Sequence, residues 1–285
     1  MICTVCGCGS AAAKDSAGIH RHDHNDHGDH DEGHRHDAPA GAIQTPLGAV
    51  HAPGTARSRV IEVEQDILAE NNRFAADNRK LFNARRILGV DLMSSPGSGK
   101  TTLLVRTIQD LRSRVPLAVI EGDQQTSFDA ERIRAAGAQT VQINTGRNCH
   151  LDAHMVGHAL RRLELKPGAV VFIENVGNLV CPAAFDLGEA SKVVMLSVTE
   201  GDDKPLKYPD IFAASDLMVL TKMDLLPYID FDVNRCIALA RRVQPTIAVV
   251  QLSATVGEGL DPWYQWIVRC RESRQEPEAV GASAR

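Results

Sequence analysis

Residues 94–102 (SSPGSGKTT) combine glycines, hydroxyls and one lysine at a spacing that suits phosphate binding. The stretch follows an apolar run and precedes a helix-like segment, so backbone N–H groups and the positive end of a helix dipole would face the same anion. In the pattern G-x-x-x-x-G-K-[ST], the lysine reaches the terminal phosphates and the final hydroxyl reaches Mg²⁺. Ser94 stands where that pattern has its first glycine, but Lys100 and Thr101 are in register. We expect this loop to bind a nucleoside phosphate through Ser95, Gly97, Ser98, Gly99, Lys100, Thr101 and Thr102.

Two later segments have the residue types that select a guanine base. Residues 221–224 (TKMD) resemble the N-K-x-D motif of GTPases, with Thr221 in place of asparagine. In that motif the aspartate, here Asp224, accepts hydrogen bonds from guanine N1 and the exocyclic amine, and the stem of Lys222 would lie over the ring. Ser253 and Ala254 resemble the S-A-x loop that contacts guanine O6 through backbone N–H groups. A solvated Lys-x-Asp at a strand end is the alternative, and the two segments together favour GTP and GDP.

Two carboxylates follow apolar runs and are candidates to hold Mg²⁺ together with Thr101. Asp123 ends the predicted strand that contains the apolar run 117–120, and Glu174 ends the one that contains the run 169–173. Residues 174–177 (ENVG) resemble the D-x-x-G switch of GTPases, in which the N–H of Gly177 would sense the γ-phosphate. We expect Lys100, Asp123 and Glu174 to serve hydrolysis, with a helix N-cap or a surface acid as the alternative for either carboxylate.

The first residues of the chain carry ligands for soft or borderline metal ions. Cys3, Cys6 and Cys8 are close enough to bind one ion, and seven histidines separated by acids lie between His20 and His36. Neutral imidazoles at this density suit several loosely held Ni²⁺ or Zn²⁺ ions. A chance cysteine cluster and an expression tag are the alternatives, although tags are usually uninterrupted histidine.

Other cysteines and histidines lie in the body of the chain. Cys149 and His150 precede a predicted helix, and Cys181 lies seven positions beyond Glu174, so a segment that moves with the γ-phosphate could carry a metal ligand. Taken singly, Cys149 and Cys181 are more often core residues. We interpret His154 and His158 as packing or solvent-facing residues. We interpret Cys236 and Cys270 as buried core residues.

Composition excludes several classes of protein. The 285 residues have a net charge of -5 and no basic stripe, which argues against nucleic-acid binding. The sequence has no apolar run near the length of a membrane span and no secretory pattern at its start, so we expect a cytoplasmic protein without membrane contact. In that compartment the seven cysteines would be reduced.

The candidate residues are positioned by alternating apolar runs and helix-sized segments. Continuous Val/Ile/Leu runs that alternate with helices predict a doubly wound, mostly parallel α/β sheet, the architecture of a P-loop GTPase domain. We expect strands at 88–93, 117–120, 140–143, 169–173, 193–198, 217–220 and 247–251. We expect helices at 60–85, 101–113, 128–136, 151–164, 209–214, 233–243 and 262–273. The predicted organisation is a disordered Cys/His-rich metal-binding extension over 1–37, a flexible linker over 38–59, the GTPase domain over 60–275 and a disordered tail over 276–285.

Taken together, these motifs resemble the HypB family of hydrogenase-maturation nickel-insertion GTPases. The resemblance rests on Cys3–Cys8, the histidine tract, residues 94–102, residues 146–153 (GRNCHLDA), residues 174–182 (ENVGNLVCP) and residues 222–225 (KMDL). It implies a GTPase of the signal-recognition/MinD-type class that dimerises when GTP is bound. It also implies two metal sites, one in the N-terminal cysteines and one formed at the dimer interface by Cys149, His150 and Cys181.

The resemblance implies GTP hydrolysis with Mg²⁺ and delivery of Ni²⁺, with Zn²⁺ possible at the same sites. The implied partners are a HypA-type nickel chaperone and the large-subunit precursor of [NiFe] hydrogenase. The alternatives are a urease-accessory nickel GTPase, expected to carry Cys-Pro-His where this chain has adjacent Cys149 and His150, and a protein that chiefly stores nickel.

Overall fold

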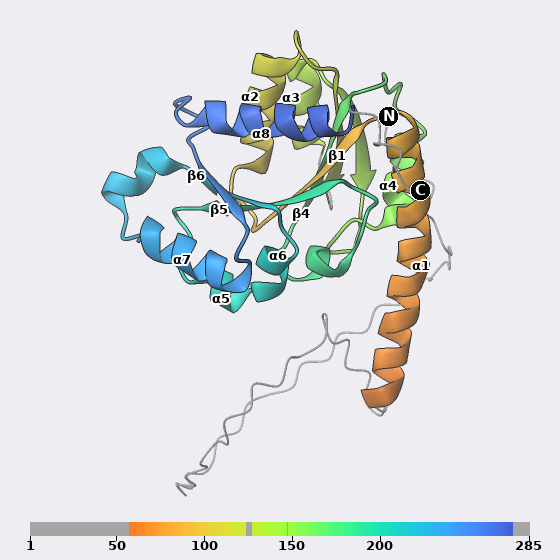
Figure 1. The fold of residues 1–285 in the computed structure, drawn as a ribbon, viewed down its shortest axis with the longest axis horizontal. Helices are drawn as coiled ribbons and strands as arrows, with labels where there is room; N and C mark the ends of the chain where they lie inside the picture. Colours follow the sequence, from red (N-terminus) through yellow and green to blue (C-terminus); the bar gives the residue numbers. More distant parts are fainter. Residues whose placement is uncertain (1–56, 124–126, 147, 276–285) are drawn as a thin grey trace, which may run out of the picture.

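A computed structural model describes residues 57–123, 127–146 and 148–275, with side chains from residue 63 onward (Figure 1). Seven strands form one sheet: β1 Leu88–Ser94, β2 Leu117–Asp123, β3 Gln139–Asn144, β4 Val170–Gly177, β5 Ser191–Ser197, β6 Leu217–Thr221 and β7 Ala248–Gln251. The α-helices are α1 Arg57–Ala84, α2 Lys100–Leu111, α3 Phe128–Ala136, α4 Ala153–Leu160, α5 Lys204–Lys207, α6 Pro209–Ala213, α7 Val233–Val243 and α8 Leu260–Ser273. Two short 3₁₀ helices are η1 Cys181–Ala184 and η2 Met223–Tyr228.

The sheet has the strand order β3-β2-β4-β1-β5-β6-β7, and every ladder between these strands is parallel. The order reverses at β1, so the chain winds outward in both directions from that strand. In sheets of this kind, ligands bind at the carboxyl ends of the strands near the reversal. The predicted doubly wound parallel fold is therefore confirmed, and the loop after β1 is at the expected binding position.

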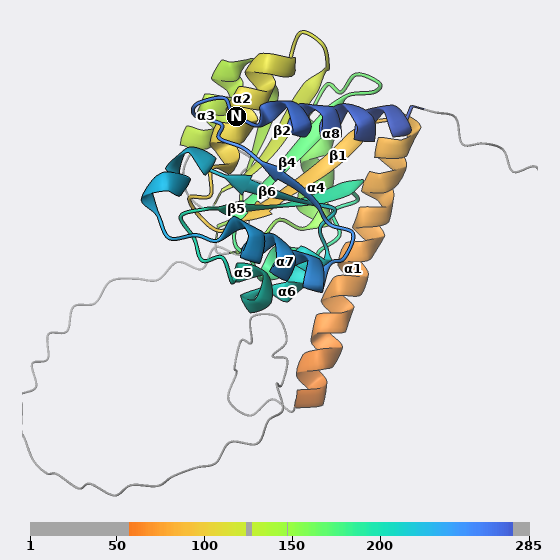
Figure 2. The same cartoon turned by 60° about the vertical axis from the view of Figure 1, so that its left-hand side comes forward.

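Helices cover both faces of the sheet (Figures 1 and 2). One face packs against α2, α3 and α8 in a cluster that includes Trp263. The other face divides into two clusters, one under α1 and α4 and one under α6 and α7. Alternate residues of β1 show the division, because Val90 and Leu92 enter the first cluster and Met93 enters a cluster on the opposite face. Burial on both faces explains the uninterrupted apolar runs in the sequence.

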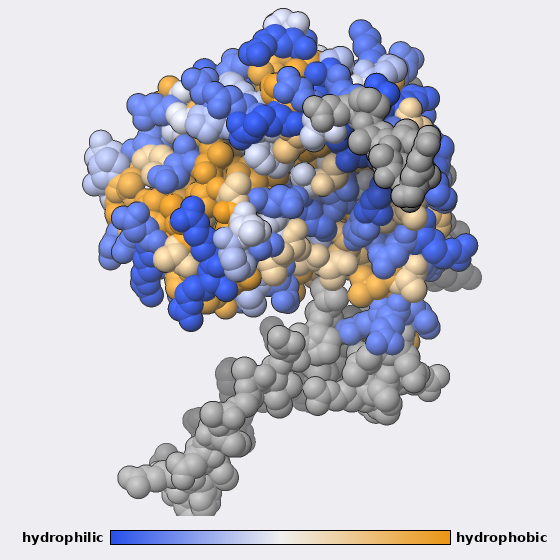
Figure 3. Space-filling view, in the orientation of Figure 1, coloured by the Kyte–Doolittle hydropathy of each residue, from blue (hydrophilic) through white to orange (hydrophobic). Residues whose placement is uncertain are grey.

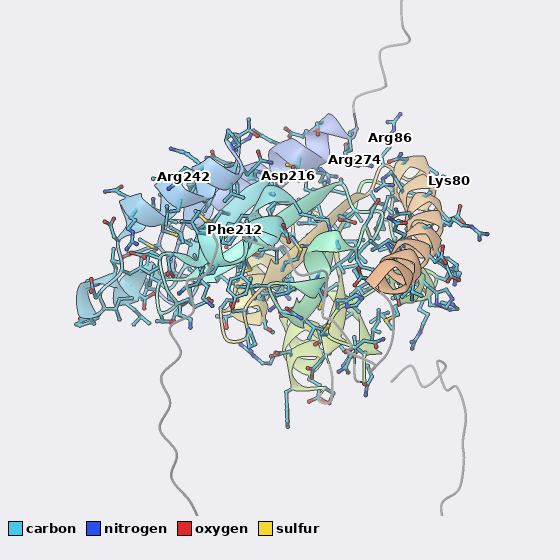
Figure 4. The ribbon with its side chains drawn as sticks, turned by 90° about the horizontal axis from the view of Figure 1, so that it is seen from below. Lys80, Arg86, Phe212, Asp216, Arg242 and Arg274 are labelled. Atoms are coloured by element: carbon cyan, nitrogen blue, oxygen red, sulfur yellow. The ribbon has the colours of Figure 1, made fainter. Side chains whose placement is uncertain are left out.

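Helix α1 lies along one side of the body, and its N-terminal end extends beyond it (Figure 1). At its C-terminal end it meets the end of α8, where the guanidinium of the C-cap residue Arg274 donates to the carbonyl of Ile87 at 3.1 Å and also to Asn83. Figure 4 shows Arg274 beside Arg86, in the turn that connects α1 to β1. This contact joins the first and last described helices.

The surface is mixed in character. Figure 3 shows apolar surface between α8 and α7, on the side where β7 is the edge strand. Of the helices that the structure describes, none is both long and apolar enough to cross a membrane.

Two predicted boundaries are wrong for a local reason. The helix predicted over 151–164 starts later, because Asp152 has extended backbone and its side chain accepts the N–H of Met155 at 2.7 Å as the N-cap of α4, and it also ends earlier, at Leu160. The i, i+4 spacing of His150, His154 and His158 also predicts one shared helical face, but His150 lies before the N-cap of α4 and is not part of that face. Glu174 does not end β4 either, since the strand continues to Gly177, which pairs with Ser94 of β1.

Candidate functional site

A cavity of about 510 Å³ opens at the carboxyl ends of β1, β2 and β4. Most of the residues predicted to bind phosphate and Mg²⁺ line it, together with four that lie outside the predicted motifs, Glu121, Gly122, Asp129 and Arg132. The lining residues are Pro96, Gly97, Ser98, Gly99, Lys100, Thr101, Thr102, Glu121, Gly122, Asp123, Asp129, Arg132, Glu174, Asn175, Val176, Gly177 and Lys222. Ser95, predicted from the same loop, lies outside this set.

The loop after β1 has the backbone of a phosphate cradle. Gly99 is the N-cap of α2 with φ 97°, a left-handed conformation that glycine adopts without steric cost. The Nζ of Lys100 donates to the Oγ of Ser94 at 2.7 Å, and Ser98 donates to the same oxygen at 2.6 Å. Burial lowers the pKa of Lys100, although Glu174 and other acids oppose the shift. Ser94 thus holds the lysine at the cavity wall, a role that a glycine at this position could not perform.

Thr101 and Glu174 meet at the point where a divalent cation would bind. The hydroxyl of Thr101 donates to Oε1 of Glu174 at 2.7 Å. The Oε2 of Glu174 is buried and has no hydrogen-bond partner among the described residues. Burial raises the pKa of Glu174 to about 7, opposed chiefly by Lys100. An orphaned carboxylate oxygen beside a hydroxyl, with Asp123 in the same cavity, is an oxygen donor set that fits Mg²⁺.

Glu121 and Asn175 are cavity residues that sequence reasoning missed. Glu121 is 3% exposed and pairs in register with Glu174 of the adjacent strand, and its Oε2 also has no partner among the described residues. Burial and the nearby Glu174 and Asp123 raise its pKa to about 8. An acid inside an apolar strand was the available signal for Glu121. Asn175 lay within a recognised motif, but nothing in the motif assigned it a contact.

Of the predicted base-binding residues, Lys222 lines the cavity and the others do not. Lys222 has φ 59°, and its Nζ donates to the carbonyl of Gly97 at 2.8 Å. The Thr221 hydroxyl donates to the carbonyl of Ser98 at 2.7 Å, so both residues support the phosphate loop. Asp224 lies in η2 and Ser253 follows β7, and neither lines the cavity. The N–H of Ser253 is bonded to the carbonyl of Glu258, which leaves Ala254 as the expected backbone donor to a base.

A second group of candidate ligands lies near the ends of two loops. Cys149, His150 and Cys181 are half-buried, and one ligand atom from each lies within 4.8 Å of the others. The two thiol sulfurs are 2.8 Å apart, and Sγ of Cys149 is 3.6 Å from Nδ1 of His150. Burial lowers the pKa of His150, which favours the neutral imidazole that metals bind. Burial and the neighbouring Cys149 raise the pKa of Cys181 to about 11, so a metal ion would displace its proton.

The other cysteines and histidines are accounted for differently. His154 and His158 are exposed on α4 with their Nε2 atoms 3.0 Å apart, which agrees with the solvent-facing interpretation. Cys236 is fully buried, as predicted, whereas Cys270 is only partly buried at the edge of the first core cluster. The prediction of a buried Cys270 is therefore wrong. Cys3, Cys6, Cys8 and the histidine tract lie outside the described residues.

Comparison with known proteins supplies the family. Residues 90–251 match the family described as "CobW/HypB/UreG, nucleotide-binding domain". The hydrogenase maturation factor HypB of Azotobacter vinelandii is 65% identical over 224 residues, covering 79% of this chain and 74% of that protein. HypB of Rhizobium leguminosarum bv. viciae is 55% identical over 289 aligned positions, covering 93% and 95%.

A solved structure agrees with these relatives. The crystal structure of HypB from Helicobacter pylori in complex with nickel matches with a TM-score of 0.69 at 34% identity, covering 74% of this chain and 100% of that one. The chain therefore belongs to the CobW/HypB/UreG family and, within it, to the HypB hydrogenase maturation factors.

Proposed function

We propose that this chain is a GTP-hydrolysing nickel metallochaperone that supplies nickel for the maturation of [NiFe] hydrogenase. In this proposal GTP binding favours a homodimer, and the nucleotide state alters the binding and release of the metal. The observation that carries the proposal is a single segment, from Glu174 to Cys181, that begins in the phosphate cavity and ends at the cysteine pair. The proposed nucleotide and metal ligands would therefore share one short piece of backbone.

The phosphate side of the proposal rests on charge and position. Lys100 and the N–H groups at the start of α2 would neutralise and orient the β- and γ-phosphates, and Gly177 would donate to the γ-phosphate. Thr101 and Glu174, with Asp123, would hold Mg²⁺, which when bound stabilises negative charge on the phosphate oxygens. The guanine base would be held by Lys222 and Asp224 and by the backbone N–H of Ala254, in the loop that begins at Ser253. The Nζ of Lys222 can keep its bond to the carbonyl of Gly97 while the aliphatic stem lies over the ring.

On the metal side, the nickel ion is cargo. Two thiolates and one imidazole from Cys149, Cys181 and His150 are a donor set for Ni²⁺ and also for Zn²⁺. Three ligands leave the coordination of the ion open, and a second copy of the chain could complete it. This fits the dimer-interface metal site that the family resemblance implies, in a dimer that forms when GTP is bound. The N-terminal cysteines would provide a separate site.

The proposed partners follow from the family. The relatives are hydrogenase maturation factors, and the proposed recipient is the hydrogenase large-subunit precursor, with a HypA-type nickel chaperone as the second partner. We propose that the protein acts in the cytoplasm. Neither nucleic acid nor a membrane is proposed as a partner.

Complementation of cells that lack the protein tests the proposal. Cys181→Ser should abolish hydrogenase activity at low nickel, and added nickel should restore it. Cys270→Ser is the matched control, because it makes the same change on α8 away from both candidate sites. Failure of added nickel to restore activity in either the deletion strain or the Cys181→Ser strain would refute a role in nickel supply. Full activity of Cys181→Ser would instead refute the metal site.

A further inference from the structure

The inner face of α1 carries two buried asparagines that belong to neither candidate site. Asn71 is 5% exposed and Asn78 is 6% exposed, and they lie seven residues apart, or two helical turns, on the face toward α4. A buried amide is costly unless both its donor and its acceptor are bonded. The partners of these two side chains therefore indicate what the helix is built to hold.

Asn71 bridges two segments that are distant in the sequence. Its Nδ2 donates to the carbonyl of Asp186 at 2.7 Å, and its Oδ1 accepts the N–H of Ala153 at 2.9 Å. Asn78 makes a similar bridge from Ala153 to the next residue of the loop. Its Nδ2 donates to the carbonyl of Ala153 at 2.7 Å and to that of Leu187 at 3.0 Å. Each asparagine thus joins the start of α4 to the loop after η1.

These two segments carry the metal ligands. Ala153 lies three residues after His150, and Asp186 lies five residues after Cys181. The rings of His150 and Phe185 are also in contact, with centroids 3.9 Å apart and planes tilted by 33°. The path from either asparagine to a candidate ligand is therefore a few residues of backbone.

The loop after η1 is pressed closely against α1. Arg79 donates to both carboxylate oxygens of Asp186 at 2.7 Å, and that carboxylate also accepts the N–H of Gly188 at 2.8 Å. A Cβ at Gly188 would lie 2.5 Å from the carbonyl of Ala75, so only glycine permits this approach. The ion pair of Asp186 and the close approach at Gly188 therefore fix the position of the loop on α1, in addition to apolar contact.

We propose that Asn71 is a positioning residue for the metal site, and that α1 acts as a clamp which sets the distance between Cys181 and the Cys149–His150 pair. This inference rests on the proposed function only for the role of the metal site, because the contacts of α1 require neither nickel nor nucleotide. An amide at position 71 is needed because it supplies a donor to one ligand-bearing segment and an acceptor to the other. Loss of the amide would let the two segments separate.

The test measures the effective concentration of the Cys149 and Cys181 thiols in the full chain. A glutathione redox buffer oxidises the two thiols to a disulfide as oxidised glutathione is reduced to two thiols, and peptide mass spectrometry quantifies that pair separately from the N-terminal cysteines. We expect Asn71→Ala to lower the effective concentration about 10-fold, the loss that follows when two buried partners are left unbonded. Asn83→Ala is the matched control, because it makes the same change on α1 at the end that contacts Arg274.

A second variant separates positioning from loss of stability. Arg79→Gln removes the ion pair with Asp186 at a half-exposed position, and we expect it to lower the effective concentration in the same direction with a smaller effect. The clamp is refuted if Asn71→Ala and Asn83→Ala change the effective concentration equally, or if a folded Arg79→Gln leaves it unchanged. Because the assay contains no nickel, its failure would leave nickel delivery standing. If instead the Cys181→Ser strain has full hydrogenase activity, the metal site is refuted, but the effect of α1 on the distance between the two thiols still stands.

Discussion

The backbone N–H of Leu151 donates to Oδ1 of Asn175 at 3.1 Å, and this bond joins the two candidate sites. Asn175 directly follows Glu174 in the phosphate cavity, and Leu151 directly follows His150 in the metal cluster. The Nδ2 of Asn175 donates to the buried carboxyl of Asp91 at 3.2 Å, which fixes the orientation of the amide. A displacement of Glu174 on nucleotide binding would therefore reach the metal ligands through one side chain.

Asn175→Ala tests this connection. Coupling between two sites is commonly about 5- to 150-fold in affinity and must be reciprocal. We expect the variant to reduce the effect of a GTP analogue on nickel affinity to less than about 2-fold while each ligand still binds alone. Isothermal titration with each ligand, in the absence and presence of the other, measures the coupling. A wild-type degree of coupling in Asn175→Ala would rule out this route.

Gly177→Ala should impair hydrolysis through steric contact. A Cβ at position 177 would lie 2.9 Å from backbone atoms of Pro96, so the switch segment or the phosphate loop must shift. Misplacement of about 1 Å can cost about 100-fold in rate, and we expect a loss of that order in kcat with a smaller change in GDP affinity. Single-turnover assays and GDP titrations separate the two effects. An unchanged kcat would show that the γ-phosphate is not sensed at this position.

Thr221 departs from the asparagine of the guanine motif but keeps a contact with the phosphate loop. Its hydroxyl donates to the carbonyl of Ser98 at 2.7 Å. Thr221→Val preserves the shape and removes the donor, so we expect nucleotide affinity to fall about 5-fold, as for the loss of one neutral hydrogen bond. Thr221→Asn, which can also donate, should retain affinity. If the valine variant binds GDP as tightly as the wild type, the contact has no role in binding.

The pKa of Glu121 predicts a pH dependence of stability in the metal-free and nucleotide-free protein. The folded-state pKa of about 8 lies above the ordinary value of 4.5, so folding takes up a proton. The free energy of unfolding should therefore decrease as the pH rises through this interval. Glu174, whose pKa is raised to about 7, contributes in the same direction. Urea denaturation at pH 6 and pH 8.5 should show a smaller decrease for Glu121→Gln, and an equal decrease would contradict the assignment.

Much of the fold was predictable because β1, β2, β4, β5 and β6 are largely buried on both faces and contain apolar runs. The errors occurred where a side-chain cap or a strand pairing set the boundary. Asp152 delays the start of α4, and pairing of Gly177 with Ser94 extends β4 beyond Glu174. Neither contact has a signal in hydrophobic periodicity.

The candidate site was predictable only where a local motif carries its residues. Lys100 and Thr101 stand in one motif, and the cavity contains both. The place of Glu121 in the site depends on the adjacent strand, where Glu174 is its register partner. The role of Asn71 depends on its bonds to Ala153 and Asp186, which lie 82 and 115 residues away along the chain. Such roles depend on tertiary register, which a single sequence does not display.

The most direct test of the central claim is the nickel affinity of the Cys149, His150 and Cys181 site, measured with and without a non-hydrolysable GTP analogue. In the full chain with Cys3, Cys6 and Cys8 replaced by serine, nickel–thiolate absorption reports only cysteines outside the N-terminal cluster, because imidazole ligands do not give that band. Cys181→Ser in the same background should abolish the band and identifies its source. We predict that the analogue changes the nickel affinity of this site at least about 5-fold, the lower end of common allosteric coupling. Equal affinity in the two nucleotide states would contradict the account.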